Sequence, residues 1–364
     1  MAFDLLDAVY GCFIGAAVGD ALGAPAEGRS YWRLQEEYGR LEDLVGSALG
    51  NTNGLPGGVT GDTALRQYVA LAIVRKEGRI GPDDLAELWV EKGSSELFGG
   101  NERVVFEKLS WGANPWDSGR GGNPSSAAAA AVVPVGIINA ANPAQAYQDG
   151  VAIASVIQDG VERDAAAALA AAVSRAMMPG ATLADVATAT DEHASDLMRR
   201  AIDLTLNLAM TSGSIEGFTR LYYEQLADWQ TAQPLHLWEP VPEGYPARSR
   251  YNAGSGLERL PVALALLHLC DDDVNQGIIE GANFGRSCNA IASIVGSIAG
   301  ALHGATRIRR NWIDTCEAAN HDLCTGLEGD QTASFYSMAW RLVNSLKGER
   351  RATESRLKAL DKLL

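Results

Sequence analysis

The chain has 364 residues and a formal net charge of −15, with 47% hydrophobic and 21% charged residues. This apolar content is sufficient for a large buried core, in one domain or in two small ones. Because proteins bind nucleic-acid phosphates with clustered Lys and Arg, the acidic charge argues against DNA or RNA as the main partner. We therefore expect no nucleic-acid partner.

The cysteines and the first residues indicate the compartment. Five cysteines are an odd number, and none of the paired spacings of a zinc site occurs among them. Asp4 and Asp7 interrupt the start of the chain, which lacks the basic segment of a secretory signal peptide. We therefore expect a reducing, cytoplasmic compartment.

Small residues recur at every fourth position in two segments far apart in the chain. They lie within 7–28 and 285–304 (Gly11, Gly15, Gly19 and Gly23; Ala292, Gly296, Gly300 and Gly304). This spacing places them on one face of a helix, where another backbone can approach closely. We expect helices 7–22 and 288–303 to pack through these faces. The apolar run 290–302 is shorter than the roughly 20 residues of a membrane span, so we expect buried helices and no membrane partner.

Helical periodicity dominates the rest of the chain, and strand signals are scarce. Hydroxyl and carboxylate groups at the start of 59–75 suit a helix N-cap, and apolar residues follow at helical spacing. A loop rich in Gly, Asn, Pro and Ser over 110–126 leads into an Ala-rich helix that is interrupted near Pro134. Further helices are expected over 82–92, 143–158, 163–177, 182–209, 257–269 and 274–282.

One segment breaks this pattern. Residues 229–252 contain four prolines and several aromatic residues, and we expect a long irregular loop over the helical body. Long loops of this kind often cover functional sites. Because no internal repeat or change in composition requires a second domain, we predict one all-α domain over 1–364, a compact orthogonal helical bundle.

Three motifs, in this order, resemble the ADP-ribosylglycohydrolase family. They are Gly15-Ala-Ala-Val-Gly-Asp-Ala-Leu-Gly-Ala-Pro-Ala-Glu27, Val59-Thr-Gly-Asp-Thr63 and Ala282-Asn-Phe-Gly-Arg-Ser-Cys-Asn-Ala-Ile-Ala292. The resemblance covers most of the chain and implies the fold of that family. It also implies hydrolysis of ADP-ribosyl bonds with two divalent ions, usually magnesium, bound by carboxylates of these motifs.

The chain departs from the metal-ligand set that the resemblance implies. The family positions retained are Glu27, Thr60, Asp62 and Thr63. Three family aspartates are replaced by Gly61, Ser287 and Asn289, a threonine by Ala290, and a glycine by Arg286. Hard divalent cations prefer carboxylate oxygens, and three such groups are missing while one cation is added. We therefore expect no dinuclear metal centre and no other cofactor.

Two retained carboxylates are the candidate catalytic groups. Asp62 could act as the general base that activates water at an anomeric carbon, and Glu27 could be the second carboxylate of a glycosidic site. The alternatives are an N-cap carboxylate for Asp62 and a surface turn residue for Glu27. We favour the catalytic interpretation for both.

Arg286 has two functional interpretations. It could replace the metal charge by pairing with Glu27 or Asp62, or it could bind a substrate phosphate or carboxylate. The alternative is an exposed arginine that points out of the loop. We place Arg286 among the expected substrate-binding residues.

Cys288 opens the second glycine-faced helix, where a helix N-terminus can lower a thiol pKa. His303 lies fifteen residues further along the same helix, ~22 Å away at the helical rise. We therefore favour a small buried thiol over a nucleophile, and we place Cys288 among the expected substrate-binding residues. The remaining candidates for substrate contact, some of which could simply cap helices, are Thr60, Asn123, Ser125, Ser287 and Asn289.

These residues predict a divergent glycohydrolase. We expect it to cleave an N- or O-ribosyl bond of a nucleoside, nucleotide or ADP-ribose-like small molecule without a dinuclear metal centre. One alternative is an inert member of the fold that binds a ligand or has a structural role. The other is a hydrolase that uses a single metal ion bound by Glu27 and Asp62.

Overall fold

The computed structural model describes residues 3–46, 53–93, 98, 100–226 and 256–363. Within these residues the regular elements are all helices, and no strand occurs. The predicted all-α fold is therefore confirmed. The predicted loop 229–252 lies outside the described residues.

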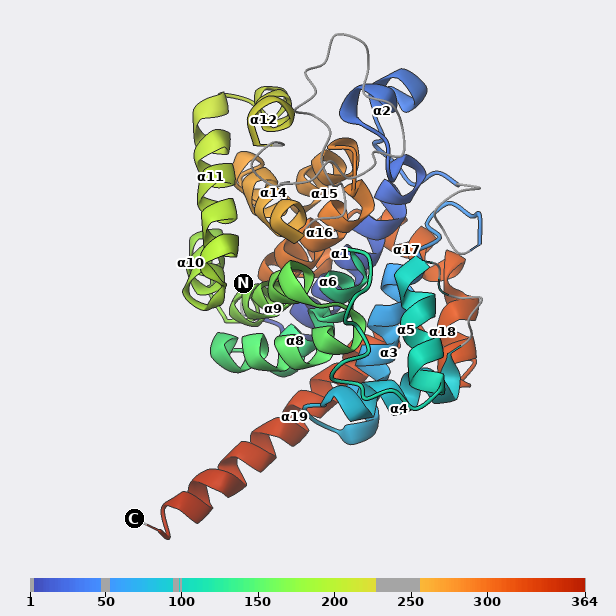
Figure 1. Ribbon diagram of the computed structural model, residues 1–364, viewed down its shortest axis with the longest axis vertical. Helices are drawn as coiled ribbons and strands as arrows, with labels where there is room; N and C mark the ends of the chain where they lie inside the picture. The colour runs from blue at the N-terminus through green and yellow to red at the C-terminus, as the bar shows by residue number, and fades with distance from the viewer. Residues whose placement is uncertain (1–2, 47–52, 94–97, 99, 227–255, 364) are drawn as a thin grey trace.

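The helices of the first half begin with α1, near the centre of the molecule in Figure 1. Their bounds are α1 Leu5–Gly23, η1 Ala24–Ala26, α2 Tyr31–Tyr38, α3 Gly61–Lys76, α4 Pro82–Lys92, α5 Gly100–Ser110, α6 Ala127–Ala131, α7 Val133–Ile138, α8 Pro143–Ile157 and α9 Gly160–Ala176.

The second half supplies a further layer of helices around the same core. Their bounds are α10 Leu183–His193, α11 Asp196–Ser212, α12 Ile215–Leu221, η2 Tyr222–Leu226, α14 Gly256–Leu269, α15 Val274–Asn283, α16 Cys288–His303, η4 Ala305–Arg307, α17 Arg310–Ala319, α18 His321–Glu328 and α19 Phe335–Leu360.

Helices α1 and α16 pack backbone to backbone, as the glycine spacing predicts. A Cβ built on Gly15 would overlap the carbonyl of Gly296, and one built on Gly296 would overlap the carbonyl of Gly15. Gly11 and Gly300 stand in the same relation one turn further along. Because no side chain separates the two helices, the residues at their ends are brought close together. This packing positions the candidate site.

Most predicted helices agree with the structure to within a few residues. The Ala-rich helix is interrupted at Val132, just before Pro134, so that α6 and α7 are separate. The predicted helix 182–209 is two helices, α10 and α11. Ser195 causes the break, because its side chain accepts a hydrogen bond from the backbone N–H of Met198 and starts a new helix there.

The N-terminal helix is apolar enough to be compared with a membrane span. Leu5–Ala26 is long and apolar enough to cross a bilayer, but 78% of its most apolar 18-residue window is buried inside the protein. Helix α1 packs on α16 within the core, which accounts for this burial.

The C-terminal helix extends beyond the helical body. Helix α19 contains 26 residues, and Figure 1 shows its second half projecting away from the other helices. Phe335, Met338 and Leu342 are buried in the body, whereas every residue over 350–363 is exposed. The projecting half therefore makes no contribution to the core.

Candidate active site

The three motifs meet at one fully buried carboxylate, that of Asp20 on α1. Its Oδ2 accepts hydrogen bonds from the backbone N–H of Thr60 (2.9 Å) and from the Thr63 hydroxyl (2.6 Å), both at the start of α3. The side-chain amide of Asn289, at the start of α16, donates to Oδ1 at 3.4 Å. Asp20 therefore fixes the positions of the two helix N-termini that carry the candidate residues.

Asp62 lies in the first turn of α3 and its backbone N–H is capped by the Thr60 hydroxyl at 3.2 Å. Its carboxylate Oδ2 is buried and has no hydrogen-bond partner. Burial and the nearby Asp20 raise the pKa of Asp62 to about 7, although a hydrogen bond from Ser126 acts in the opposite direction. The carboxylate is thus able to exchange a proton near neutral pH.

Glu27 follows the short helix η1, where Pro25 helps to turn the chain after α1. The residue is half-buried. Burial, followed by the charges of Asp62 and Asp20, raises the pKa of Glu27 to about 8. The charge of Asp62 therefore acts on Glu27, and the two carboxylates belong to one electrostatic group. The structure brings together the two carboxylates that the sequence analysis selected.

A third carboxylate, Glu102 on α5, faces the same group and was not selected from the sequence. Its charge raises the pKa of both Glu27 and Asp62, and its Oε1 accepts a hydrogen bond from the Ser125 hydroxyl. Ser125 also accepts one from the side chain of Gln158 at 2.9 Å. The predicted candidate Ser125 thus lies beside the carboxylates, held by two neighbours.

Asn123 belongs to the same loop but is exposed. Its backbone carbonyl accepts a hydrogen bond from Gln158 at 3.1 Å, which fixes the loop rather than the side chain. The structure therefore places Asn123 at the surface of the loop, two residues from the contact that Ser125 makes with Glu102.

Two buried arginines supply positive charge to this group. Arg259 on α14 attracts both Glu27 and Asp62, and it donates from Nη1 to Glu162 (2.9 Å) and to the backbone carbonyl of Ser125 (3.0 Å). Arg66 on α3 is fully buried and attracts Asp20 and Asp62. It donates to the Ala130 carbonyl and to the Ser293 hydroxyl.

Neither arginine was predicted from the sequence to belong to the site. A signal for Arg259 was present, because Glu258 and Arg259 stand in the otherwise apolar run Leu257–Leu267. A charge in such a run is buried, and buried charges are found in proteins only with partners. Arg66 carries the same signal, since buried apolar residues surround it on α3.

Arg286 does not pair with Glu27 or Asp62, so that prediction is wrong. Its guanidinium Nε lies 2.9 Å from Oε2 of Glu258, and both side chains are buried (1% and 0% exposed). The backbone φ of Arg286 is +64°, in the left-handed region that the glycine of the related motif adopts without strain. This backbone and the Glu258 pair direct the guanidinium into the core.

Cys288 is a small buried thiol, as favoured from the sequence, and not a substrate contact. Its side chain is fully buried and its Sγ donates to the carbonyl of Gly23 at 3.3 Å. Burial and the charge of Glu27 raise its pKa far above the usual range. A helix N-terminus therefore does not activate this thiol.

The other residues expected to contact the substrate lie at the starts of α3 and α16. The hydroxyl of Thr60 donates to Asp20 Oδ1 at 2.9 Å, so Thr60 positions the start of α3 instead of facing a ligand. Ser287 precedes α16 but makes no side-chain cap hydrogen bond. The carbonyl oxygen Oδ1 of Asn289 is buried without a partner next to Asp20.

A family model described as ADP-ribosylglycohydrolase matches residues 1–351. The chain belongs to the ADP-ribosylglycohydrolase family. The resemblance found in the three motifs is thereby confirmed, and it extends over nearly the whole chain.

Two relatives and one solved structure illustrate how far the similarity goes. The chain is 24% identical over 311 residues to the uncharacterized protein YegU of Escherichia coli (strain K12), covering 82% of this chain and 89% of that protein. It is 26% identical over 309 residues to an uncharacterized protein of Archaeoglobus fulgidus, covering 83% and 89%. A solved structure described as an ADP-ribosylglycohydrolase-related protein complex shares its fold, with a TM-score of 0.60 and 19% identity over 92% of this chain and 99% of that one.

The ADP-ribosylglycohydrolase motifs imply two divalent ions, but the donors at this site do not fit such a centre. Ser287 and Asn289 stand at the ligand positions of α16, and the oxygens there are neutral. Asp20 already accepts hydrogen bonds from Thr60 and Thr63, which occupy its oxygens. Among the described residues, no group of three His, Cys, Asp or Glu side chains has an arrangement that could hold a metal ion.

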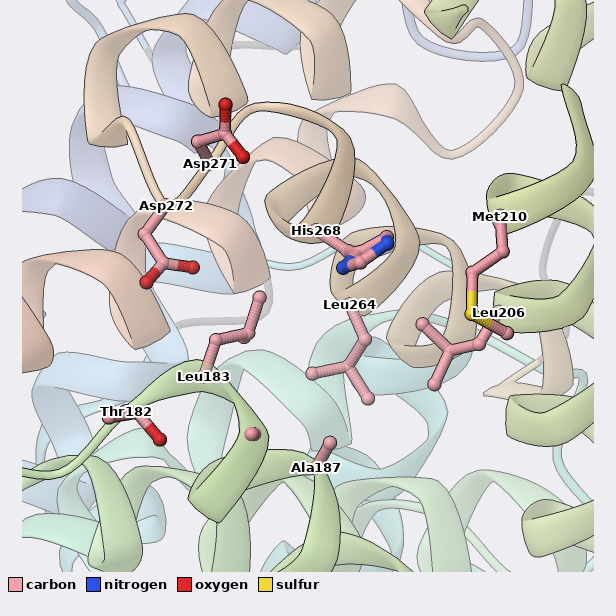
Figure 2. A pocket seen from close by; sticks show the side chains of 10 residues that line it. Thr182, Leu183, Ala187, Leu206, Met210, Leu264, His268, Asp271 and Asp272 are labelled. Carbon is pink, nitrogen blue, oxygen red and sulfur yellow. The ribbon is translucent and has the colours of Figure 1, made fainter. Parts of the chain in front are cut away.

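A separate cavity of about 430 Å³ lies between α10, α11 and α14, away from these carboxylates. Its walls are mostly apolar, and its titratable residues are His268, Asp271 and Asp272. Figure 2 shows the carboxylates of Asp271 and Asp272 pointing in different directions. Both belong to the acidic turn before α15, whose last residue, Asp273, caps that helix. The cavity lining does not include Glu27 or Asp62, so this cavity is separate from the three motifs.

Proposed function

We propose that this member of the ADP-ribosylglycohydrolase family hydrolyses an N- or O-ribosyl bond of a small molecule with Glu27 and Asp62, without a dinuclear metal centre. The observation that supports this function is the coupled pair itself: two carboxyl groups whose pKa values are raised to about 8 and about 7. Family membership supports the reaction class. No nucleic-acid or membrane partner is required, and a cytoplasmic location remains our expectation.

The two carboxyl groups have different roles because one proton is shared between them near neutral pH. The first proton to leave belongs chiefly to Asp62, whose pKa is the lower of the two. Ionised Asp62 accepts a proton from the attacking water, and protonated Glu27 donates one toward the departing group. When the pKa values of two neighbouring groups differ in this way, one group can act as the acid and the other as the base at the same pH.

Buried arginines hold the site together without metal ions. Arg66 attracts Asp20 and Asp62, and Arg259 attracts Glu27 and Asp62. Their charges offset part of the repulsion among the four carboxylates, Glu102 included. Arg66 and Arg259 thus have the electrostatic role that the sequence suggests for Arg286.

The experiment is a screen for release of free ribose or ribose phosphate from nucleosides, nucleotides and ADP-ribose derivatives. Parent protein, Asp62→Asn and Glu27→Gln are compared on each compound in buffer with EDTA. General acid–base catalysis contributes about 10²–10⁴-fold, so we expect each variant to lose at least about 10²-fold in turnover. Thr188→Ala, an exposed position on α10, is the matched control and should turn over like the parent.

Two outcomes would contradict the proposal. Turnover that both carboxylate variants retain would remove the pair from the mechanism. Binding of ribosyl compounds without turnover of any of them would instead indicate an inert ligand-binding member of the fold.

A further inference from the structure

Arg259 presents one edge of its guanidinium group without any partner. The side chain is 2% exposed, and only Nη1 is occupied, by Glu162 and by the backbone of Ser125. Both Nε and Nη2 are buried and have no hydrogen-bond partner. These two nitrogens lie on the same side of the planar group and together form a two-pronged donor.

The same chain shows what this edge of an arginine binds. Arg79 uses its Nε and Nη2 to hold the two carboxylate oxygens of Asp149 at 2.6 and 2.8 Å. No oxyanion of the described residues occupies the corresponding edge of Arg259. A buried donor without a partner is destabilising, so an oxyanion bound there would gain by supplying the missing hydrogen bonds.

Arg259 is held firmly enough to serve as a binding group. Glu162 accepts from Nη1 with Oε2 and from the backbone N–H of Gly256 with Oε1 (2.8 Å), so its carboxylate is fixed at both oxygens. Because Nη1 is anchored, the orientation of the free edge is determined before any ligand arrives. Preorganisation of this kind reduces the entropic cost of binding.

Arg259 belongs to the candidate active site. Arg259 attracts both Glu27 and Asp62, and its Nη1 contacts the loop that carries Ser125. We propose that the Nε and Nη2 of Arg259 bind an oxyanion of the substrate, a phosphate or a carboxylate attached to the ribosyl group. This inference rests on the proposed function, and it assigns anionic ribosyl compounds, and not neutral nucleosides, as the substrate class.

The ligand must displace part of the protein to reach this edge. Both nitrogens are closed to water in the ligand-free structure. The adjoining loop Gly121–Ser125 is exposed at three of its five residues, and it contacts Arg259 through one backbone carbonyl.

The test measures binding of ligands that have no leaving group, so it does not depend on turnover. Ribose, ribose 5-phosphate and ribose oxidised to a carboxylate at C5 are titrated into the parent protein by calorimetry. We expect at least one of the two anions to bind ten or more times more tightly than ribose. The phosphate and carboxylate arms show which oxyanion the site prefers.

Substitutions of Arg259 test whether this residue causes the preference for an anion over ribose. Arg259→Gln should reduce the advantage of the anion over ribose to within about twofold, and Arg259→Lys should keep only part of it, since an ammonium cannot form the two-pronged contact. Arg310→Gln is the matched control, because that arginine is exposed and pairs with Asp314 on its own helix, α17. It should bind like the parent.

Arg259→Gln leaves Glu162 without its cation and could unfold the protein, so the double variant Glu162→Gln/Arg259→Gln is measured as well. It removes both charges and should also lose the preference for the anion. The inference is overturned if the parent binds the anions no better than ribose, or if a folded Arg259→Gln variant keeps the parent's preference. Ribosyl hydrolysis could still occur in either case.

Discussion

The raised pKa values of Glu27 and Asp62 connect the chemistry of the site to the stability of the protein. Ordinary values are 4.5 and 3.8, against about 8 and about 7 in the folded chain. At pH values between the ordinary and the raised pKa of each group, the folded state binds more protons than the unfolded state. The free energy of unfolding therefore decreases as the pH rises. This contribution to stability is complete below about pH 4 and is lost as the pH passes 8.

Glu27→Gln should consequently stabilise the protein, and more so at higher pH. A neutral amide avoids the cost of a buried charge, so we expect about 1 kcal/mol or more at pH 8.5 and a much smaller gain at pH 4.5. Thermal unfolding of parent and variant across this pH range measures the difference. A gain that is equal at both ends of the range would show that Glu27 does not titrate as described.

The buried pair of Arg286 and Glu258 makes a structural prediction in place of a catalytic one. Removing one partner of a buried ion pair leaves the other charge uncompensated, so Arg286→Ala should lower the free energy of unfolding by about 3–5 kcal/mol. Arg310→Ala, which breaks an exposed pair on α17, should change it by less than about 1 kcal/mol. Urea unfolding compares the two. Equal, small effects would mean that the Glu258 carboxylate is not held by Arg286.

At the scale of elements, the crossing of α1 and α16 is the feature on which the site depends. Adding one methyl group at Gly15 or Gly296 would force it into the backbone of the other helix. We expect Gly15→Ala and Gly296→Ala to destabilise the protein by about 1–3 kcal/mol or more, as overpacking does. A shift in melting temperature measures this.

Gly326 on α18 provides the matched control, because a Cβ built there meets nothing within 4 Å. Alanine is the better helix former by about 1 kcal/mol, so Gly326→Ala should leave stability unchanged or raise it. If the alanine variants at Gly15 and Gly296 also melt at or above the temperature of the parent, the two helices do not pack as closely as described.

The sequence predicted those parts of the structure that a regular pattern encodes. Four-residue spacing of glycines predicted the α1–α16 packing, and the motif residues predicted that Glu27 and Asp62 meet. Ser195 divides 182–209 into two helices through one local cap, which helical periodicity does not reveal. The partners of the buried arginines could not be predicted from the sequence either. Arg286 pairs with Glu258 and Arg259 pairs with Glu162, because tertiary packing decides which charges are buried together.

At the scale of the whole molecule, the projecting half of α19 is separate from the helical body. The family model ends at residue 351, where the fully exposed part of the helix begins. A chain that ends at Arg350 should keep the melting temperature of the full chain to within about 2 °C, since solvent-exposed residues contribute little to stability. It should also keep ribosyl turnover. A loss of several degrees would show that residues 351–364 contact the body.

The central claim is that the carboxylate pair catalyses ribosyl hydrolysis without a dinuclear metal centre. The most direct measurement is the rate of ribose release by the parent protein and Asp62→Asn after EDTA treatment, with bound magnesium and manganese determined in the same sample. Our account predicts that the metal-free parent retains full turnover and that Asp62→Asn loses at least about 10²-fold. Turnover that disappears with EDTA and returns with stoichiometric Mg²⁺ would contradict it.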